Sequence, residues 1–129
     1  MSNAIVDALA ELRSKPAGSL SSKTLESSND VGEDKVWAKY HEAVAEVRAV
    51  WGEPELGPMG GAYEGPGWLA GYKGDCPSED DYFRQLYCHA LRIGWWKRVG
   101  FIHAVMMTGH DAKTLQMLQL AVARARKAP

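Results

Sequence analysis

The stretch from Asp80 to Thr108 most constrains what this chain can fold into, because large apolar side chains are concentrated in it. On a helical wheel, the apolar residues of its first half share one side, which predicts an amphipathic helix. A helix continued past Gly94 would place Trp95 and Trp96 on the polar side, so we expect it to end or bend there. The apolar residues that define this helix are Tyr82, Phe83, Leu86, Tyr87, Ala90, Leu91 and Ile93.

The tryptophan pair after Gly94 allows two interpretations. In the first, both indoles fold back and cover the core. In the second, they form an exposed aromatic and basic patch that binds a partner, since Trp and Arg are enriched where interfaces concentrate their binding energy. The candidate interface residues are Arg84, Arg92, Trp95, Trp96, Lys97 and Arg98.

Helical periodicity recurs elsewhere in the chain. Apolar residues recur at helical spacing in residues 3–13, and a longer stripe with spacings of three and four begins after Asp34 and ends at Trp51-Gly52. Residues 112–128 consist largely of strong helix formers. Residues 101–108 are uniformly apolar, and a helix is favoured there because the neighbouring segments are predicted helices. We therefore predict a mainly α fold of four to five helices; the alternative is an α+β fold with 101–108 as a strand.

Composition divides the chain into segments. With 129 residues and 46% hydrophobic content, the chain can bury one core. We expect an N-terminal helix in 1–13, a flexible linker in 14–33 that is poor in apolar residues, and one helical domain in 34–129. The Gly- and Pro-rich loop 52–77 allows a short β-hairpin, but Pro66-Gly67 stand after Gly65 where a phosphate-binding loop needs Lys and Ser/Thr.

The net charge of −1 conceals an uneven distribution. Residues 1–81 hold fifteen acidic and seven basic side chains, whereas residues 82–129 hold eight basic side chains and the single acid Asp111. One interpretation is that the two halves pack together and their charges compensate. The other is that the basic face stays open and attracts acidic proteins or nucleic acid.

No motif in the sequence defines a catalytic, metal or cofactor site. The paired short spacings of zinc sites are absent among the cysteines and histidines, so no metal and no cofactor is predicted. Cys76 and Cys88 are expected not to be bonded to each other, since a helix between them would hold them too far apart. There is no apolar run of membrane-spanning length and no secretory signal, so we expect a cytoplasmic protein that does not enter the membrane.

Two functional hypotheses follow. The favoured one is a non-catalytic macromolecular interaction module, such as a small bacterial regulator, inhibitor or immunity-type protein. It would bind a protein partner, acidic in character, through the aromatic and basic surface, and nucleic acid is a less supported partner. The alternative is a small enzyme that uses Cys88 or a histidine, His103 or His110, in a cleft covered by loop 52–77.

Overall fold

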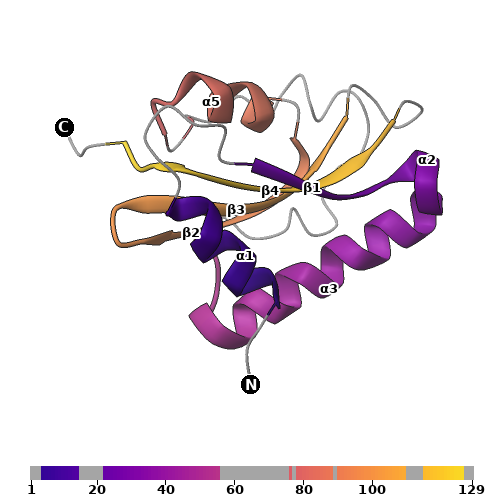
Figure 1. Cartoon of the computed structure of the whole chain (residues 1–129), viewed down its shortest axis with the longest axis horizontal. Coiled ribbons are helices and arrows are strands. Elements are labelled where there is room, and N and C mark those ends of the chain that lie inside the picture. The colour runs from indigo at the N-terminus through magenta and orange to yellow at the C-terminus, as the bar shows by residue number, and fades with distance from the viewer. Residues whose placement is uncertain are drawn as a thin grey trace.

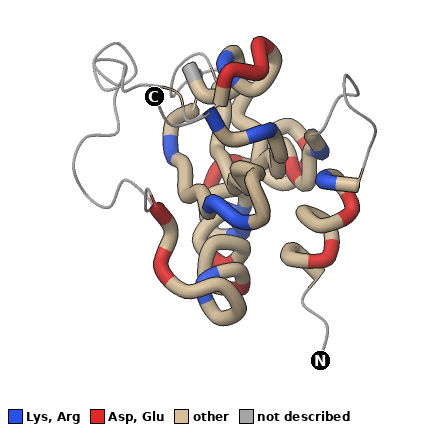
Figure 2. Tube along the Cα trace, turned by 90° about the vertical axis from the view of Figure 1, so that its left-hand side faces the viewer, with Lys and Arg blue, Asp and Glu red and all other residues tan. Residues whose placement is uncertain are grey.

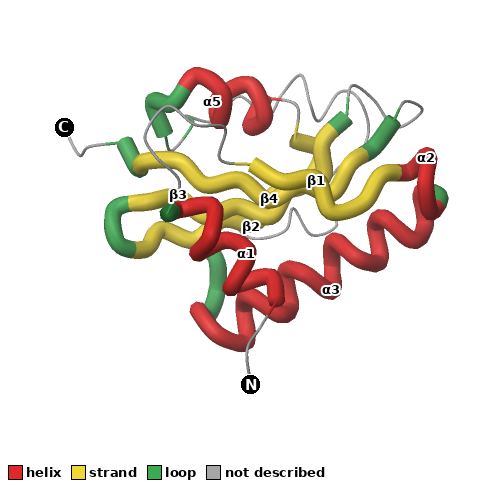
Figure 3. Tube along the Cα trace, viewed as in Figure 1, coloured by secondary structure: helices red, strands yellow, loops and turns green. Residues whose placement is uncertain are grey.

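The computed structural model describes residues 4–14, 22–55, 76, 78–88, 90–109 and 115–126, which form an α+β fold (Figure 3). The strands form one antiparallel sheet in the order β1-β4-β3-β2. The helices are α1 (Ala4–Arg13), α2 (Ser28–Val31), α3 (Glu33–Trp51) and α5 (Asp81–Cys88). The strands are β1 (Ser22–Ser27), β2 (Ala90–Arg98), β3 (Phe101–Thr108) and β4 (Met117–Arg124).

The sheet lies between two helical layers, with α1 and α3 on one face and α5 on the other (Figure 1). Alternate residues of each strand point to opposite faces. In β3, Val105 and Met107 therefore join the core under α1 and α3, whereas Ala104 and Met106 join the core under α5. The sheet therefore separates two hydrophobic cores and contributes side chains to both.

The prediction of a mainly α, helical protein is wrong. The predicted central helix ends at Cys88, and the chain then runs into β2, while residues 101–108 are a strand, as in the alternative interpretation. Both strands are buried on both faces over most of their length. A strand buried on both faces shows a continuous apolar run and lacks the alternation that identifies a half-exposed strand. Apolar residues could therefore be placed on one side of a helical wheel, although the structure places them in a sheet.

The C-terminal helix predicted for residues 112–128 is also wrong, since Met117–Arg124 form β4. β4 pairs with β3 on one side and with β1 on the other, so its backbone groups are satisfied within the sheet. Leu118 and Leu120 pack into the core under α1 and α3, and the small Ala121 and Ala123 pack under α5. Tertiary pairing thus overrides a helix propensity that amounts to only a few tenths of a kcal/mol per residue.

The segment 14–33, expected to be a flexible linker, contains β1 and α2, and its residues 15–21 lie outside the described part. β1 is an edge strand that pairs with β4, with a register shift between Thr24 and Glu26. An edge strand takes its hydrogen bonds from a neighbour and needs few apolar side chains of its own; here Leu25 contacts the core. The low apolar content of this segment was therefore compatible with a strand.

The first two predicted helices agree with the structure. α1 covers Ala4–Arg13, and α3 ends at Trp51, where Gly52 has φ +82° and its N–H donates to the Arg48 carbonyl at 2.9 Å. α3 begins at Glu33 after Gly32, one residue before the Asp34 cap that the sequence suggested. Most of loop 52–77, including its predicted hairpin, lies outside the described residues. No described helix combines the length and apolar character needed to cross a bilayer.

Candidate interaction surface

Five basic residues lie at or beside the end of the sheet where β2 turns into β3, here called the basic end; Figure 1 shows this turn at the left. Phe101 pairs with Arg98 on one side and with Arg124 on the other, so both arginines share its sheet face, toward α1 and α3. Figure 2 views the molecule from this end. The basic end consists of Arg13, Lys97, Arg98, Arg124 and Arg126, of which Arg13 is half-buried and the others are exposed.

The cations of the basic end make no ion pair with any described residue. The ion pairs in the described part of the chain join Lys39 to Glu26, Arg48 to Glu53, and Arg84 to Asp81. None of these pairs includes a residue of the basic end. Here the positive charge of the C-terminal half is thus left without a direct carboxylate partner.

Arg13, the last residue of α1, contacts His103 in the centre of β3. Its Nη1 donates to Nε2 of His103 at 3.1 Å. A guanidinium is always protonated and only donates, so Nε2 must accept, which assigns the neutral ring with its proton on Nδ1. The side chain of His103 is fully buried, and its Nδ1 has no well-aligned hydrogen-bond partner among the described residues.

His103 has a strongly lowered pKa. Burial, followed by the positive charges of Arg13 and Arg98, lowers it from the ordinary value of 6.5 to about 4. The nearby carbonyl groups of Trp96 and Phe101 partly oppose this effect without forming a well-aligned hydrogen bond to Nδ1. His103 is therefore neutral at physiological pH and serves as an uncharged acceptor for Arg13.

Aromatic rings support the second arginine. The guanidinium carbon of Arg98 lies 5.0 Å from the ring centroid of Trp51, at the end of α3. The ring of Trp51 packs edge-on against the rings of His103 and Trp96, with centroid-to-centroid distances of 4.9 Å and 6.4 Å. Cation–π contact of this kind fixes a guanidinium without neutralising its charge. Arg98 is thus held in place while its charge remains available.

The turn at the tip of the β2–β3 hairpin consists of Val99 and Gly100, and its backbone is strained. Val99 has φ +48° and Gly100 has φ +83°, as in a turn of type I′, which requires positive φ at both positions. A β-branched residue with positive φ is an outlier, because its Cβ crowds the backbone. Val99 is also 74% exposed, so no burial offsets this strain. Backbone strain kept at an exposed apolar residue is a feature typical of functional sites.

We expect Val99→Asn to stabilise the protein by about 1 kcal/mol, because asparagine tolerates the left-handed conformation and Val99 loses no packing. Urea unfolding of the two proteins measures this difference. Val99→Ala is the control: it removes the branch but keeps the Cβ, so a smaller gain is expected. A loss of stability in the asparagine variant would contradict the strained-turn assignment.

The structure does not bring the six sequence-predicted interface residues together. Trp96 is buried on the α3 side, where its indole N–H donates to the Gly52 carbonyl at 2.8 Å, and Trp95 is half-buried on the α5 side. Arg92 is buried, and its guanidinium carbon lies 5.8 Å from the ring centroid of Trp37. Arg84 is exposed on α5, on the opposite face of the sheet from α1 and α3. Lys97 and Arg98 are the members exposed together at the basic end.

Sequence reasoning missed the other members of this surface. Arg13, Trp51 and Arg124 come from separate segments, and no local pattern connects them to Arg98. Val99-Gly100 did carry a signal, since a residue followed by glycine between two apolar runs indicates a two-residue hairpin turn. A strand assignment for the flanking residues would have been needed to use that signal.

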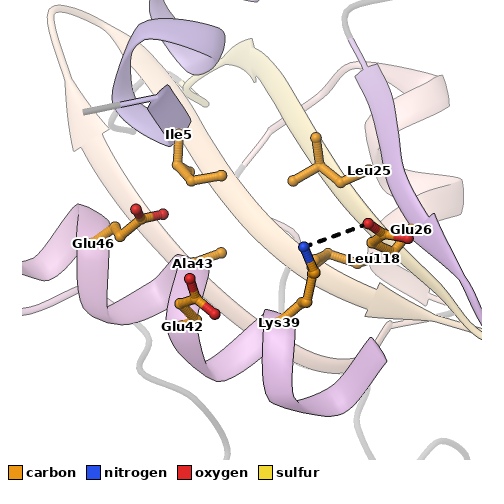
Figure 4. Close-up of a pocket in the computed structure, with 8 residues that line it drawn as sticks. All are labelled: Ile5, Leu25, Glu26, Lys39, Glu42, Ala43, Glu46 and Leu118. Carbon is orange, nitrogen blue, oxygen red and sulfur yellow. Dashed lines mark ion pairs between the residues drawn. The ribbon is translucent and has the colours of Figure 1, made fainter. Parts of the chain in front are cut away.

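A cavity of about 240 Å³ opens between α1, β1 and α3 (Figure 4). Its apolar lining comes from Ile5, Leu25, Ala43 and Leu118, and its charged lining from Glu26, Glu42, Glu46 and Lys39. The Lys39 ammonium pairs with Glu26 at 3.6 Å. The volume lies below the range typical of drug-sized ligand sites. Among the described residues, no cysteine or histidine lines this cavity, so its described lining offers none of the groups that the enzyme hypothesis names.

The residues of the enzyme hypothesis are only partly described. His103 is fully buried with Nε2 bound to Arg13, while the side chains of Cys88 and His110 lie outside the described part. Cys76 forms no disulfide in the structure. Among the described residues, no three histidine, cysteine or acidic side chains lie close enough to hold a metal ion. No family model, curated protein or solved structure matches this chain.

Proposed function

We propose that this protein is a non-catalytic interaction module that binds an acidic protein partner through the basic end and the adjacent hairpin tip. The observation that carries the proposal is the exposed, strained Val99, flanked by cations that have no ion pair in the described part of the chain. An apolar contact beside unpaired cations is the combination that recognises an acidic protein surface with an apolar centre.

A protein partner fits these observations better than nucleic acid. Nucleic-acid binding depends mainly on many phosphate contacts and does not require an exposed apolar side chain at the contact. The basic end offers five cations, and the chain as a whole has a net charge of −1. Val99, at the tip of the hairpin, contributes an apolar contact that a phosphate backbone cannot use.

Affinity capture from the native host tests the proposal. The immobilised protein is incubated with lysate, and bound proteins are identified by mass spectrometry for the wild type, Arg98→Glu and Val99→Asn. Both substitutions should weaken capture of the same acidic protein at least tenfold, since each removes an anchor from the centre of the surface. Capture should also weaken with added salt, because exposed charges are screened.

Arg84→Glu is the matched control. It reverses one exposed arginine on α5, outside the basic end, and should leave capture unchanged. Val99→Asn is informative in a second way, because it is expected to raise stability while it lowers binding. Equal capture by the wild type, Arg98→Glu and Val99→Asn, or an equal loss in Arg84→Glu, would refute the assignment of this surface.

A further inference from the structure

Arg13 and Arg98 are two guanidinium groups held at one corner of the molecule by uncharged partners. Arg13 donates to the neutral imidazole of His103 at 3.1 Å, and Arg98 lies 5.0 Å from the centroid of the Trp51 ring. The rings of Trp51 and His103 are themselves 4.9 Å apart. The chain of contacts Arg98, Trp51, His103, Arg13 therefore fixes both guanidiniums without a counter-charge.

Each guanidinium contacts one ring of the same pair, Arg13 that of His103 and Arg98 that of Trp51. Each of them disfavours a positive charge on His103, and neither makes an ion pair with a described carboxylate. Like charges near a buried aromatic surface repel each other, and Arg13 is also half-buried. An anion bound between them would remove this repulsion.

The number and geometry of the donors select the anion. A guanidinium has five N–H donors in a planar fork, and His103 uses one donor of Arg13. A phosphate monoester carries a charge near −2 at neutral pH and three acceptor oxygens, which matches two forks, whereas a carboxylate has one charge and two oxygens. Arg124, one strand beyond Phe101 on the same sheet face, adds a third positive charge at the rim.

We propose that Arg13 and Arg98 form a binding site for a phosphate monoester, carried by a phosphorylated segment of the protein partner. This inference rests on the proposed function, because the site adjoins the hairpin tip assigned to partner binding. Arg98 belongs to both the phosphate site and the partner-binding surface. Its guanidinium holds the phosphoryl group, and its neighbours Lys97 and Val99 contact the chain that carries this group.

NMR titration of the ¹⁵N-labelled protein tests the site directly. The probes are a three-residue acidic peptide with a central phosphoserine, the same peptide without phosphate, inorganic phosphate, and acetate at matched ionic strength. The phosphopeptide should give saturable shifts of the Arg13 and Arg98 Nε–Hε signals and raise the pKa of His103, because the bound anion offsets both positive charges. The unphosphorylated peptide should bind at least tenfold more weakly, and acetate should give no saturable shift.

Variants assign the effect to the two arginines. Arg13→Gln and Arg98→Gln should each remove saturable binding, while Arg84→Gln should retain it. The amide spectrum of each variant reports whether that variant is folded. If Arg13→Gln does not fold, Arg98→Gln alone decides the test. Inorganic phosphate that binds as tightly as the phosphopeptide would overturn the partner as the source of the phosphate. Equal shifts with phosphopeptide and acetate would overturn the site. In that case partner capture that still depends on Arg98 and Val99 would leave the proposed function standing.

Discussion

Replacing Trp96 with alanine should lower the free energy of unfolding by about 3–5 kcal/mol, the usual effect of emptying a large aromatic site in a core. Trp96 is only 3% exposed, contacts Trp51, and donates its indole N–H to the Gly52 carbonyl at 2.8 Å. It therefore fastens the end of α3 to β2. Urea unfolding should show a lower midpoint with an unchanged dependence on urea concentration.

Two further variants separate the contributions to this effect. Trp96→Phe keeps much of the ring packing but loses the hydrogen bond to Gly52, and it should cost about 1–3 kcal/mol. Trp95→Ala should cost less than Trp96→Ala, because Trp95 is half-buried and its indole nitrogen has no hydrogen-bond partner among the described residues. A Trp96→Ala protein as stable as the wild type would show that this indole lies outside the core.

Acidification from pH 7 to pH 4 should destabilise the protein by about 3 kcal/mol through His103 alone. The folded-state pKa is about 4 and the ordinary value is 6.5. Between these values the unfolded chain binds a proton that the folded protein does not, so stability falls as pH falls. Above about pH 7 both states carry a neutral His103, and its contribution no longer changes with pH.

The comparison with His103→Gln isolates this effect from the acidic groups that also titrate in this range. Glutamine offers Arg13 an acceptor oxygen and does not titrate. The difference in unfolding free energy between wild type and variant should be constant above pH 7 and should shift by about 3 kcal/mol in favour of the variant at pH 4. Parallel stability profiles for the two proteins would show that His103 is not held neutral by the fold.

The sequence by itself determined the parts of the structure that depend on local signals. The apolar stripes of α1 and α3 have helical spacing, and Gly52 permits the backbone conformation at which α3 ends, so both helices could be placed from the residues alone. From the sequence, Cys76 and Cys88 were expected not to be bonded to each other, and Cys76 forms no disulfide in the structure, but the expectation rested on a longer helix than the structure contains. The separation of the two cysteines was expected to follow from a helix that begins at Pro77, whereas α5 begins at Asp81.

Only the tertiary structure decided which apolar segments are strands. Ala90–Arg98, Phe101–Thr108 and Met117–Arg124 are buried on both faces of the sheet over most of their length, so no alternation reveals them. β4 in particular consists of residues that also favour helices, and it is a strand because β1 and β3 pair with it on both sides.

The candidate site likewise depends on the fold. Arg13, Trp51, Arg98 and Arg124 lie on α1, α3, β2 and β4, and the sheet brings them to one end of the molecule. Arg98 and Lys97 were recognised from the sequence as candidate interface residues. The sequence pattern also grouped them with Trp96, which the structure buries. Local periodicity indicates which side chains are buried. The position of distant cations at one end of the sheet depends on strand order and register, which local sequence patterns do not encode.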